Sequence, residues 1–433
     1  MNIAVVALGK IGLPLAVQFA SMGHRVLGVD VNTDTVAKVN AGVEPFPGEA
    51  LLAEKLAEVV GSGLLTATTD TAEAVAQSDA VVLVVPLFVD ADGVPDFEWM
   101  DAATRAVARG LQPGTLVSYE TTLPVGTTRT RFAPMLAEGS GLRAGTDFSL
   151  VFSPERVFTG RVFSDLRRYP KLVGGVDEAS GASGVQFYRA VLEFDERDDL
   201  PRPNGVWDLG SAEAAEMAKL AETTYRDVNI GLANQFARYA AATGIDVYQV
   251  IEACNSQPFS HIHQPGIAVG GHCIPIYPRM YLWNDPEATV VRAAREANAE
   301  MPEYAVLQLE AAHGSLTGER VAVLGAAYRG GVKETAFSGV FPLVAALRDR
   351  GAEVVVHDPM YTDDELRAFG FEPYDAGMPA DAVVVQANHT EYRELTSADF
   401  PGVRTVVDGR RVLAPEAWDV DAFVVLGRSH TPA

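Results

Sequence analysis

Cysteine is scarce in this 433-residue chain, which contains only Cys254 and Cys273. Two cysteines cannot build a disulfide framework, and a working thiol needs a reducing environment. Basic residues are also in deficit, with 34 lysines and arginines against 57 aspartates and glutamates and a formal net charge of −23. This negative charge repels an extended phosphate backbone, so we expect no nucleic-acid partner.

Long hydrophobic runs are absent as well. The first apolar run, residues 3–8, is far too short to span a bilayer, and no basic leader with a small-residue cleavage site is present. We therefore expect a cytoplasmic protein with no membrane partner. Hydrophobic residues still make up 48% of the chain, and the length predicts two or three domains with their own cores.

A strand, a tight turn and a helix open the chain. Residues 2–8 are apolar and β-branched, a turn with two glycines follows, and residues 13–23 carry apolar side chains at helical spacing. The next apolar run ends at Asp30, about 20 residues beyond the turn, where a dinucleotide-binding unit needs a carboxylate for the ribose hydroxyls. Ala7 replaces the first glycine of the GxGxxG pattern, which costs the turn some freedom. These features predict NAD, and Asp30 disfavours NADP because a carboxylate repels the added phosphate.

Apolar runs typical of buried parallel strands follow at residues 80–86 and 114–120. The segment FSLVFSPERV and residues 171–175 are predicted to be two more strands. Ligands of open α/β sheets collect in loops at the carboxyl ends of strands. Thr122 lies in such a loop, and Glu155 lies just past another strand, where a surface carboxylate is the alternative interpretation. The expected cofactor-binding residues are Gly9, Lys10, Ile11, Gly12, Asp30, Pro86 and Thr122.

The pattern changes at residues 211–242, a helix-like stretch with no internal proline and one glycine. We expect it to be the spine that joins two domains. Glu216, Lys219, Thr223 and Arg226 recur at spacings that place them on one helical face. Lysine is scarce in this chain, so Lys219 is a candidate site residue, although it could instead extend past a neighbouring glutamate towards solvent.

The segment GGHCIPIYP places Cys273 between a glycine pair and two prolines. Glycines let the backbone approach a ligand closely and prolines stiffen the exit, so the loop displays the thiol. Cys273 is therefore a candidate nucleophile, while a buried thiol beside a tight turn is the alternative. Cys254, in the helix-like segment YQVIEACN, is predicted to fill core space.

The last third of the chain repeats the alternation of strands and helices. We expect helices at 285–314 and 338–350 and strands at 320–325, 352–358, 381–386 and 405–408. No full glycine fingerprint of a dinucleotide-binding turn is present here. This part of the chain is therefore predicted to hold a different nucleotide or to support the active-site cleft. Basic residues that could meet a diphosphate are Arg329, Lys333, Arg410 and Arg411. The predicted fold class is α/β, with two doubly wound, Rossmann-like domains joined by a long central helix.

Six separated motifs carry a resemblance to a known family: LGKIGLPLA, TTLPVGT, SPERV, AEMAKLAETTYRDVNIGLAN, QPGIAVGGHCIPIYP and VVDGRRVL. In order and rough spacing, the chain resembles the UDP-glucose/GDP-mannose dehydrogenase family over essentially its whole length. The central helix and the GGHC loop are most similar to the branch that oxidises UDP-N-acetyl-hexosamines. The resemblance implies an NAD-binding domain at 1–208, a central helical dimerisation domain with the cysteine loop at 209–300, and a nucleotide-sugar-binding domain at 301–433.

Family members oxidise the C6 alcohol of a nucleotide-sugar to a carboxylate with two NAD and one water. By resemblance, Cys273 would form a thiohemiacetal and then a thioester, Lys219 would stabilise oxyanions, and Glu155 would be the acid/base. Thr122 and Thr223 would complete the catalytic residues. Substrate contacts would come from Arg156, Lys219, Gly270, Gly271, Tyr277, Arg329 and Arg411. We expect no metal, and a homodimer or higher homo-oligomer.

Three positions depart from the family pattern. Thr223 stands where asparagine is usual, Tyr277 where aspartate is usual, and Ala336 where arginine is usual. Tyr277 cannot supply the carboxylate that normally pairs with the lysine, and we interpret the departures as an altered substrate subclass. Two alternatives stay open: a two-electron, NAD-dependent hydroxyacid-type dehydrogenase and a non-catalytic nucleotide-sugar-binding relative.

Overall fold

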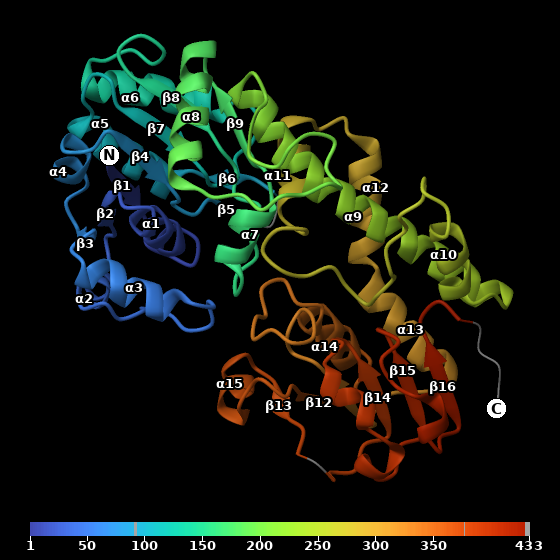
Figure 1. Ribbon diagram of the computed structural model, residues 1–433. Coiled ribbons are helices and arrows are strands. Elements are labelled where there is room, and N and C mark those ends of the chain that lie inside the picture. The colour runs from blue at the N-terminus through green and yellow to red at the C-terminus, as the bar shows by residue number, and fades with distance from the viewer. Residues whose placement is uncertain (91–92, 376, 429–433) are drawn as a thin grey trace. The chain divides into compact units, whose positions relative to one another are not determined.

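A computed structural model describes residues 1–90, 93–375 and 377–428. The chain forms two compact units, Met1–Ala221 and Glu222–Ala433, and each is built on its own sheet (Figure 1). Helix α9 (Ala212–Thr243) is 32 residues long and contains the boundary between the two units. This confirms the long central helix. The division into three domains at 208 and 300 stays a prediction.

The first unit contains an eight-stranded sheet in the order β10-β9-β8-β7-β4-β1-β2-β3. Its strands are β1 (Asn2–Val6), β2 (Arg25–Val29), β3 (Leu65–Thr68), β4 (Ala80–Leu83), β7 (Leu116–Tyr119), β8 (Ser149–Phe152), β9 (Lys171–Gly175) and β10 (Val206–Asp208). The six strands from β3 to β8 are parallel in the doubly wound order. Strand β9 then runs antiparallel to β8. A short antiparallel pair, β5 (Phe88–Val89) and β6 (Pro95–Asp96), lies outside this sheet.

Strand β1 is apolar throughout because both faces of the sheet are covered. Ile3 and Val5 pack into one buried cluster, and Ala4 and Val6 pack into another on the opposite face. The first cluster contains side chains of α1 (Gly12–Ser21), α2 (Thr33–Asn40), α3 (Leu52–Gly61), α7 (Val162–Arg168) and α8 (Glu178–Val191). The second contains side chains of α4 (Thr71–Ala76), α5 (Glu98–Gly110), the π-helical turn η1 (Thr128–Phe132) and α6 (Ala133–Ser140).

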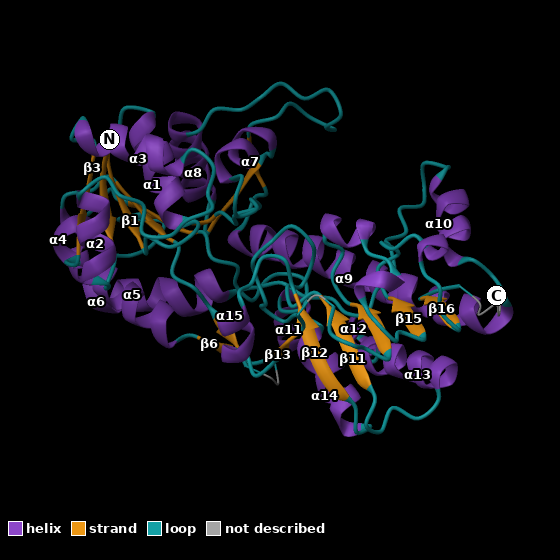
Figure 2. Ribbon diagram, turned by 90° about the horizontal axis from the view of Figure 1, so that it is seen from below, coloured by secondary structure: helices purple, strands orange, loops and turns teal. Residues whose placement is uncertain are grey.

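The second unit contains a six-stranded parallel sheet in the order β13-β12-β11-β14-β15-β16 (Figure 2). Its strands are β11 (Arg320–Leu324), β12 (Glu353–His357), β13 (Glu372–Pro373), β14 (Ala382–Val385), β15 (Thr405–Asp408) and β16 (Ala422–Val425). Helices α13 (Met301–His313) and α14 (Val340–Asp349) cover one face. The other face is covered by aromatic side chains of loops and short 3₁₀ turns, including Tyr392 and Trp418. The strand order repeats that of the first unit, so the prediction of two doubly wound domains is confirmed.

The described residues of the second unit also form the shorter helices α10 (Val247–Asn255), α11 (Tyr277–Asn284), α12 (Thr289–Ala299) and α15 (Asp363–Ala368). Three 3₁₀ turns lie at Thr390–Glu394, Ser397–Asp399 and Pro415–Ala417. The expectation of one helix at 285–314 is wrong, because α12 and α13 meet at Glu300. Pro302, in the first turn of α13, has no backbone N–H to continue the α12 ladder. Within the part of the chain that the structure describes, no helix has the length and apolar character needed to cross a membrane.

Candidate active site

The turn after β1 has the shape of a phosphate cradle. Ala7 adopts a left-handed backbone with φ of +76°, which costs a side-chain-bearing residue about 1 kcal/mol. Gly12 begins α1, and a Cβ there would lie 1.9 Å from the Ala7 carbonyl oxygen. A Cβ at Gly9 would meet nothing within 4 Å. The turn is therefore packed at Gly12 and open at Gly9, which suits the approach of a pyrophosphate to the first turn of α1.

Asp30 follows β2 and holds this turn. The Leu8 N–H donates to Asp30 Oδ2 at 2.8 Å, and the Asn32 N–H donates to Oδ1 at 2.9 Å. A carboxylate has about four acceptor sites, so capacity remains for ribose hydroxyls. Ile11 is the N-cap residue of α1 and Lys10 beside it is exposed. The residues of the turn thus fit the adenosine end of NAD.

The remaining predicted cofactor residues come from neighbouring strands. Pro86 follows β4 and is exposed, while Thr122 follows β7 and is buried. The Thr121 hydroxyl donates to the Val85 carbonyl oxygen at 2.6 Å and so joins the two loops. Because β1, β2, β4 and β7 are parallel neighbours, their following loops lie along one edge of the sheet.

Glu216 on α9 anchors the far end of the Thr122 loop. Its carboxylate accepts the Gly126 N–H at 2.5 Å, the Thr128 N–H at 2.9 Å and the Thr128 hydroxyl at 2.7 Å. Burial raises the pKa of Glu216 to about 7, although these hydrogen bonds oppose the shift. The sequence placed Glu216 on the face of Lys219 but did not indicate that it binds this loop.

Glu155 contacts a buried lysine that the sequence interpretation overlooked. Lys171 Nζ contacts Glu155 Oε1 and also donates to Glu120 Oε2 at 2.7 Å. Lys171 is the first residue of β9, and the antiparallel β8–β9 pairing brings it to the edge where β8 ends. Arg156, a predicted substrate contact, is half-buried and donates to the Pro170 carbonyl oxygen at 3.4 Å.

Lys219 is buried on α9, with 7% of its surface exposed. Its positive charge acts on Lys171, where it adds to the effect of burial in lowering the Lys171 pKa. Of the chain's six lysines, Lys171 and Lys219 are the two that the structure buries. A buried lysine is costly unless it is paired. The burial of Lys219 therefore favours a site residue over a lysine that extends into solvent.

Cys273 lies in the second unit, half-buried, four residues before α11. Its carbonyl oxygen accepts the N–H groups of Ile276, at 3.2 Å, and Tyr277, at 3.0 Å, so the cysteine begins the turn that leads into the helix. Cys254 is only partly buried on α10, so the expectation that it fills core space is wrong.

The glycine pair before the cysteine packs against the chain itself. A Cβ at Gly270 would lie 2.5 Å from Tyr328 Cβ, and one at Gly271 would lie 3.1 Å from the Tyr328 ring. The Gly271 N–H donates to the Ala336 carbonyl oxygen at 2.8 Å. Close backbone approach is therefore required here, and the partner that the structure shows is the loop after β11 rather than a ligand. Substrate binding by Gly270 and Gly271 stays a prediction.

A buried polar network in the second unit holds the start of the cysteine loop. Asp227 on α9 accepts from Arg295 at 2.6 Å and from Asn298 at 2.8 Å. Asn298 in turn accepts from Asn234, whose side-chain oxygen accepts the Gly266 N–H at 2.9 Å. Asp227 and Asn234 stand out in the sequence as polar residues on an otherwise apolar helix face. Their partners could not be predicted, because they lie far away in the sequence.

The predicted basic residues of the second unit differ in their roles. Arg329 is exposed after β11 and donates to the Tyr328 hydroxyl at 3.2 Å, while Lys333 pairs with Glu365 at 2.6 Å. Arg410 donates to the carbonyl oxygens of Gln386, at 2.7 Å, and Ala268, at 3.1 Å, and so ties the end of β15 to the cysteine loop. The Arg411 guanidinium lies 4.7 Å from the Tyr248 ring. Arg329 is thus open to a ligand, whereas Arg410 supports the loop.

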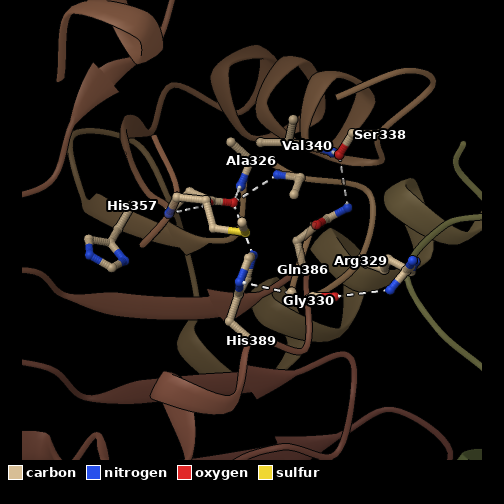
Figure 3. A network of polar contacts seen from close by, with 12 residues as sticks. Ala326, Arg329, Gly330, Ser338, Val340, His357, Gln386 and His389 are labelled. Carbon is tan, nitrogen blue, oxygen red and sulfur yellow. Dashed lines mark hydrogen bonds and ion pairs between the residues drawn. The ribbon is translucent and has the colours of Figure 1, made fainter. Parts of the chain in front are cut away.

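The end of β12 repeats the arrangement around Asp30. Asp358 Oδ2 accepts the N–H groups of Ala326 and Ala327, each at 2.9 Å, and His389 Nε2 at 3.1 Å (Figure 3). Burial acts to raise the Asp358 pKa, but His389 and the backbone donors outweigh it and lower the pKa. With more donors than Asp30, Asp358 has less capacity for a ribose, in agreement with the lack of a second glycine fingerprint.

The first unit therefore gathers Lys219, Glu155 and the predicted NAD residues, and the second unit gathers Cys273, its glycine pair and the loop that carries Arg329. Thr223 is buried on α9 and Tyr277 begins α11. Their catalytic and substrate-binding roles stay predictions. Among the described residues, no group of three His, Cys, Asp or Glu side chains could hold a metal ion.

Comparison with known families matches the chain in three segments. Residues 1–192 match the NAD binding domain of the UDP-glucose/GDP-mannose dehydrogenase family, residues 213–300 match its central domain, and residues 322–415 match its UDP binding domain.

Individual relatives match over nearly the whole length. The UDP-N-acetyl-D-mannosamine dehydrogenase of Pyrococcus horikoshii is 36% identical over 423 residues, which cover 95% of this chain and 96% of that one. The solved structure of the UDP-D-ManNAc dehydrogenase from Pyrococcus horikoshii superposes with a TM-score of 0.88, at 33% identity and 99% coverage of both chains. A UDP-glucose dehydrogenase structure from Pyrobaculum islandicum gives a TM-score of 0.86 at 29% identity, covering 99% of this chain and 98% of that one.

Proposed function

Because this chain belongs to the UDP-glucose/GDP-mannose dehydrogenase family, we propose that it oxidises the C6 alcohol of a UDP-N-acetyl-hexosamine, first of all UDP-N-acetyl-D-mannosamine, to the uronic acid. The observation that carries this proposal is the 36% identity to a UDP-N-acetyl-D-mannosamine dehydrogenase across 95% of the chain. A cytoplasmic location stays a prediction.

The proposed reaction converts one alcohol, two NAD⁺ and one water into one carboxylate, two NADH and three protons. NAD, when bound along the loops after β1, β2, β4 and β7, supplies the hydride acceptor. The Cys273 thiolate adds to the C6 aldehyde, and the resulting oxyanion is stabilised by the Lys219 ammonium. Glu155 accepts a proton from the water that cleaves the thioester.

The departures from the family pattern are proposed to adjust this chemistry. Tyr277 starts α11 four residues after Cys273 and replaces a carboxylate with a neutral phenol. Thr223 lies one helical turn after Lys219 and can still donate a hydrogen bond. We propose that these two side chains, together with Ala336, alter the substrate subclass and leave the nucleophile in place.

The test is a screen of UDP-, GDP- and dTDP-sugars with NAD⁺, scored as NADH formed per sugar consumed. Two NADH per UDP-N-acetyl-D-mannosamine support the proposal. One NADH per substrate would favour a two-electron dehydrogenase. Tight binding of the sugars without NADH would favour the non-catalytic relative.

The two cysteines provide a matched pair of variants. We expect Cys273→Ser to lower uronic acid formation by at least about 10⁴-fold, because a serine hydroxyl is a far weaker nucleophile than a thiolate. Cys254→Ser on α10 should retain wild-type turnover. Liquid chromatography of the sugar products checks both, and acid formation by Cys273→Ser at the wild-type rate would contradict the covalent route.

A further inference from the structure

Lys171 is the centre of a charge cluster buried within the first unit. The exposed fractions of the Lys171, Glu120 and Glu155 side chains are 4%, 0% and 9%. The Tyr188 hydroxyl donates to Glu120 Oε1 at 2.6 Å and lies 2.7 Å from Ser118 Oγ. Lys171 Nζ also lies 4.7 Å from the centre of the Tyr188 ring. These contacts come from β7, β9, α8 and the loop after β8, so the ammonium group is fixed from several elements.

The charges in this cluster do not serve stability alone. Burial lowers the Lys171 pKa, the Glu120 carboxylate counteracts this, and Lys219 on α9 lowers it further. Lys171 Nζ contacts a carboxylate oxygen of Glu120 and one of Glu155. Well-packed apolar side chains of the same volume usually stabilise a core as well as a buried ion pair does, so the cluster points to a role for its charge.

We propose that Lys171 is a positioning residue for Glu155: held by Glu120 and Tyr188, its ammonium group fixes the Glu155 carboxylate at the carboxyl edge of the first sheet. This inference rests on the proposed function, in which Glu155 takes the proton of the hydrolytic water. Sharing Lys171 with Glu120 is essential, because a lysine paired with Glu155 alone would make that carboxylate a weaker base.

Two variants change this sharing in opposite directions. Glu120→Gln leaves Lys171 to Glu155 alone, while Lys171→Met combined with Glu120→Gln removes the lysine and keeps the formal charge of the cluster at −1, as in the wild type. We expect the acid limb of the pH profile of kcat to move to lower pH in the single variant, because Lys171 then pairs with Glu155 alone and lowers the Glu155 pKa. In the double variant the acid limb should move to higher pH by about 1 to 2 units, because Glu155 has lost the neighbouring positive charge. KM for the UDP-sugar should change by less than about threefold in both.

A second measurement does not depend on turnover. Carbon-13 NMR of glutamate-labelled protein follows the titration of the Glu155 carboxyl group, and its resonance is assigned by its loss in Glu155→Gln. We expect the titration midpoint to shift in the same two directions as the acid limb. Lys38→Met is the control for loss of a lysine, because Lys38 is exposed on α2, and it should leave the midpoint unchanged.

The same Glu155 midpoint in wild type and both variants would overturn the inference and leave Lys171 as a structural residue. If the double variant fails to fold, the downward shift in Glu120→Gln decides alone. If the wild type forms no uronic acid, the proposed function fails, while the NMR titration still decides whether Lys171 controls Glu155.

Discussion

At the scale of single residues, the turn after β1 separates two uses of glycine. Gly12 is needed for packing, because any Cβ would collide with the Ala7 carbonyl oxygen. Gly9 faces open space, so its missing side chain serves no contact within the chain. At the first position of the pattern, Ala7 carries a methyl group on a left-handed backbone. The position therefore tolerates a side chain, although the conformation is unfavourable for any residue other than glycine.

This difference predicts opposite phenotypes for two alanine substitutions. Gly12→Ala should lower the free energy of unfolding by about 2 to 3 kcal/mol, because the turn must open to admit the Cβ. Gly9→Ala should change stability by less than about 1 kcal/mol but weaken NAD binding, because its methyl group would stand where the pyrophosphate approaches. Thermal unfolding and calorimetric titration with NAD⁺ measure the two effects. Wild-type NAD affinity in Gly9→Ala would exclude the proposed phosphate path.

At the scale of elements, α9 positions the Thr122 loop through Glu216, and this contact predicts a pH dependence. Since burial raises the Glu216 pKa from 4.5 to about 7, the folded chain keeps a proton that the unfolded chain releases between these pH values. Stability from this group is therefore greatest below pH 4.5 and falls by about 3 kcal/mol as pH rises to 7. Urea unfolding at a series of pH values should show this loss in the wild type and not in Glu216→Gln.

Glu213, one turn earlier on α9, is the control for the sign of this effect. Its hydrogen bond with Arg129 lowers the Glu213 pKa, so its contribution is present above pH 4.5 and lost as pH falls through the lowered value. Glu213→Gln should thus lose stability at neutral pH and little at low pH. The same pH trend in both variants would contradict the assignment of the raised pKa to Glu216.

Local sequence patterns predicted elements better than they predicted partners. Helix α9 and strands β1, β11 and β15 lie where apolar spacing placed them, because both doubly wound sheets are covered on two faces and leave a continuous apolar signal. The direction of β9 is not encoded in the run KLVGG, so Lys171 could not be placed beside Glu155. The break between α12 and α13 was missed because apolar spacing continues through it, although Pro302 marked the place.

At the scale of the whole molecule, one face of α9 is left uncovered within the second unit. Tyr225, Leu232, Phe236 and Tyr239 expose 54%, 45%, 38% and 66% of their surfaces. At 100° per residue these positions share one face, whereas Asp227, Asn234 and Ala237 on the opposite face are buried. We expect a second copy of the chain to cover this face, because a two-fold contact between identical helices matches an apolar stripe to itself.

This expectation predicts that Leu232→Asp weakens self-association by at least about 100-fold, because the symmetric contact buries the new charge twice. Sedimentation velocity over a range of concentrations measures the effect. Leu307→Asp, at a 47% exposed leucine on α13, is the control that should keep the wild-type association state.

The salt dependence of self-association tests the same interface. Two chains that each carry a net charge of −23 repel each other, and salt screens that repulsion over about 8 Å at physiological ionic strength. Wild-type association should therefore strengthen with added salt, as an apolar contact between like-charged chains requires. A contact made of ion pairs would weaken instead, and that outcome would exclude the α9 stripe as the interface.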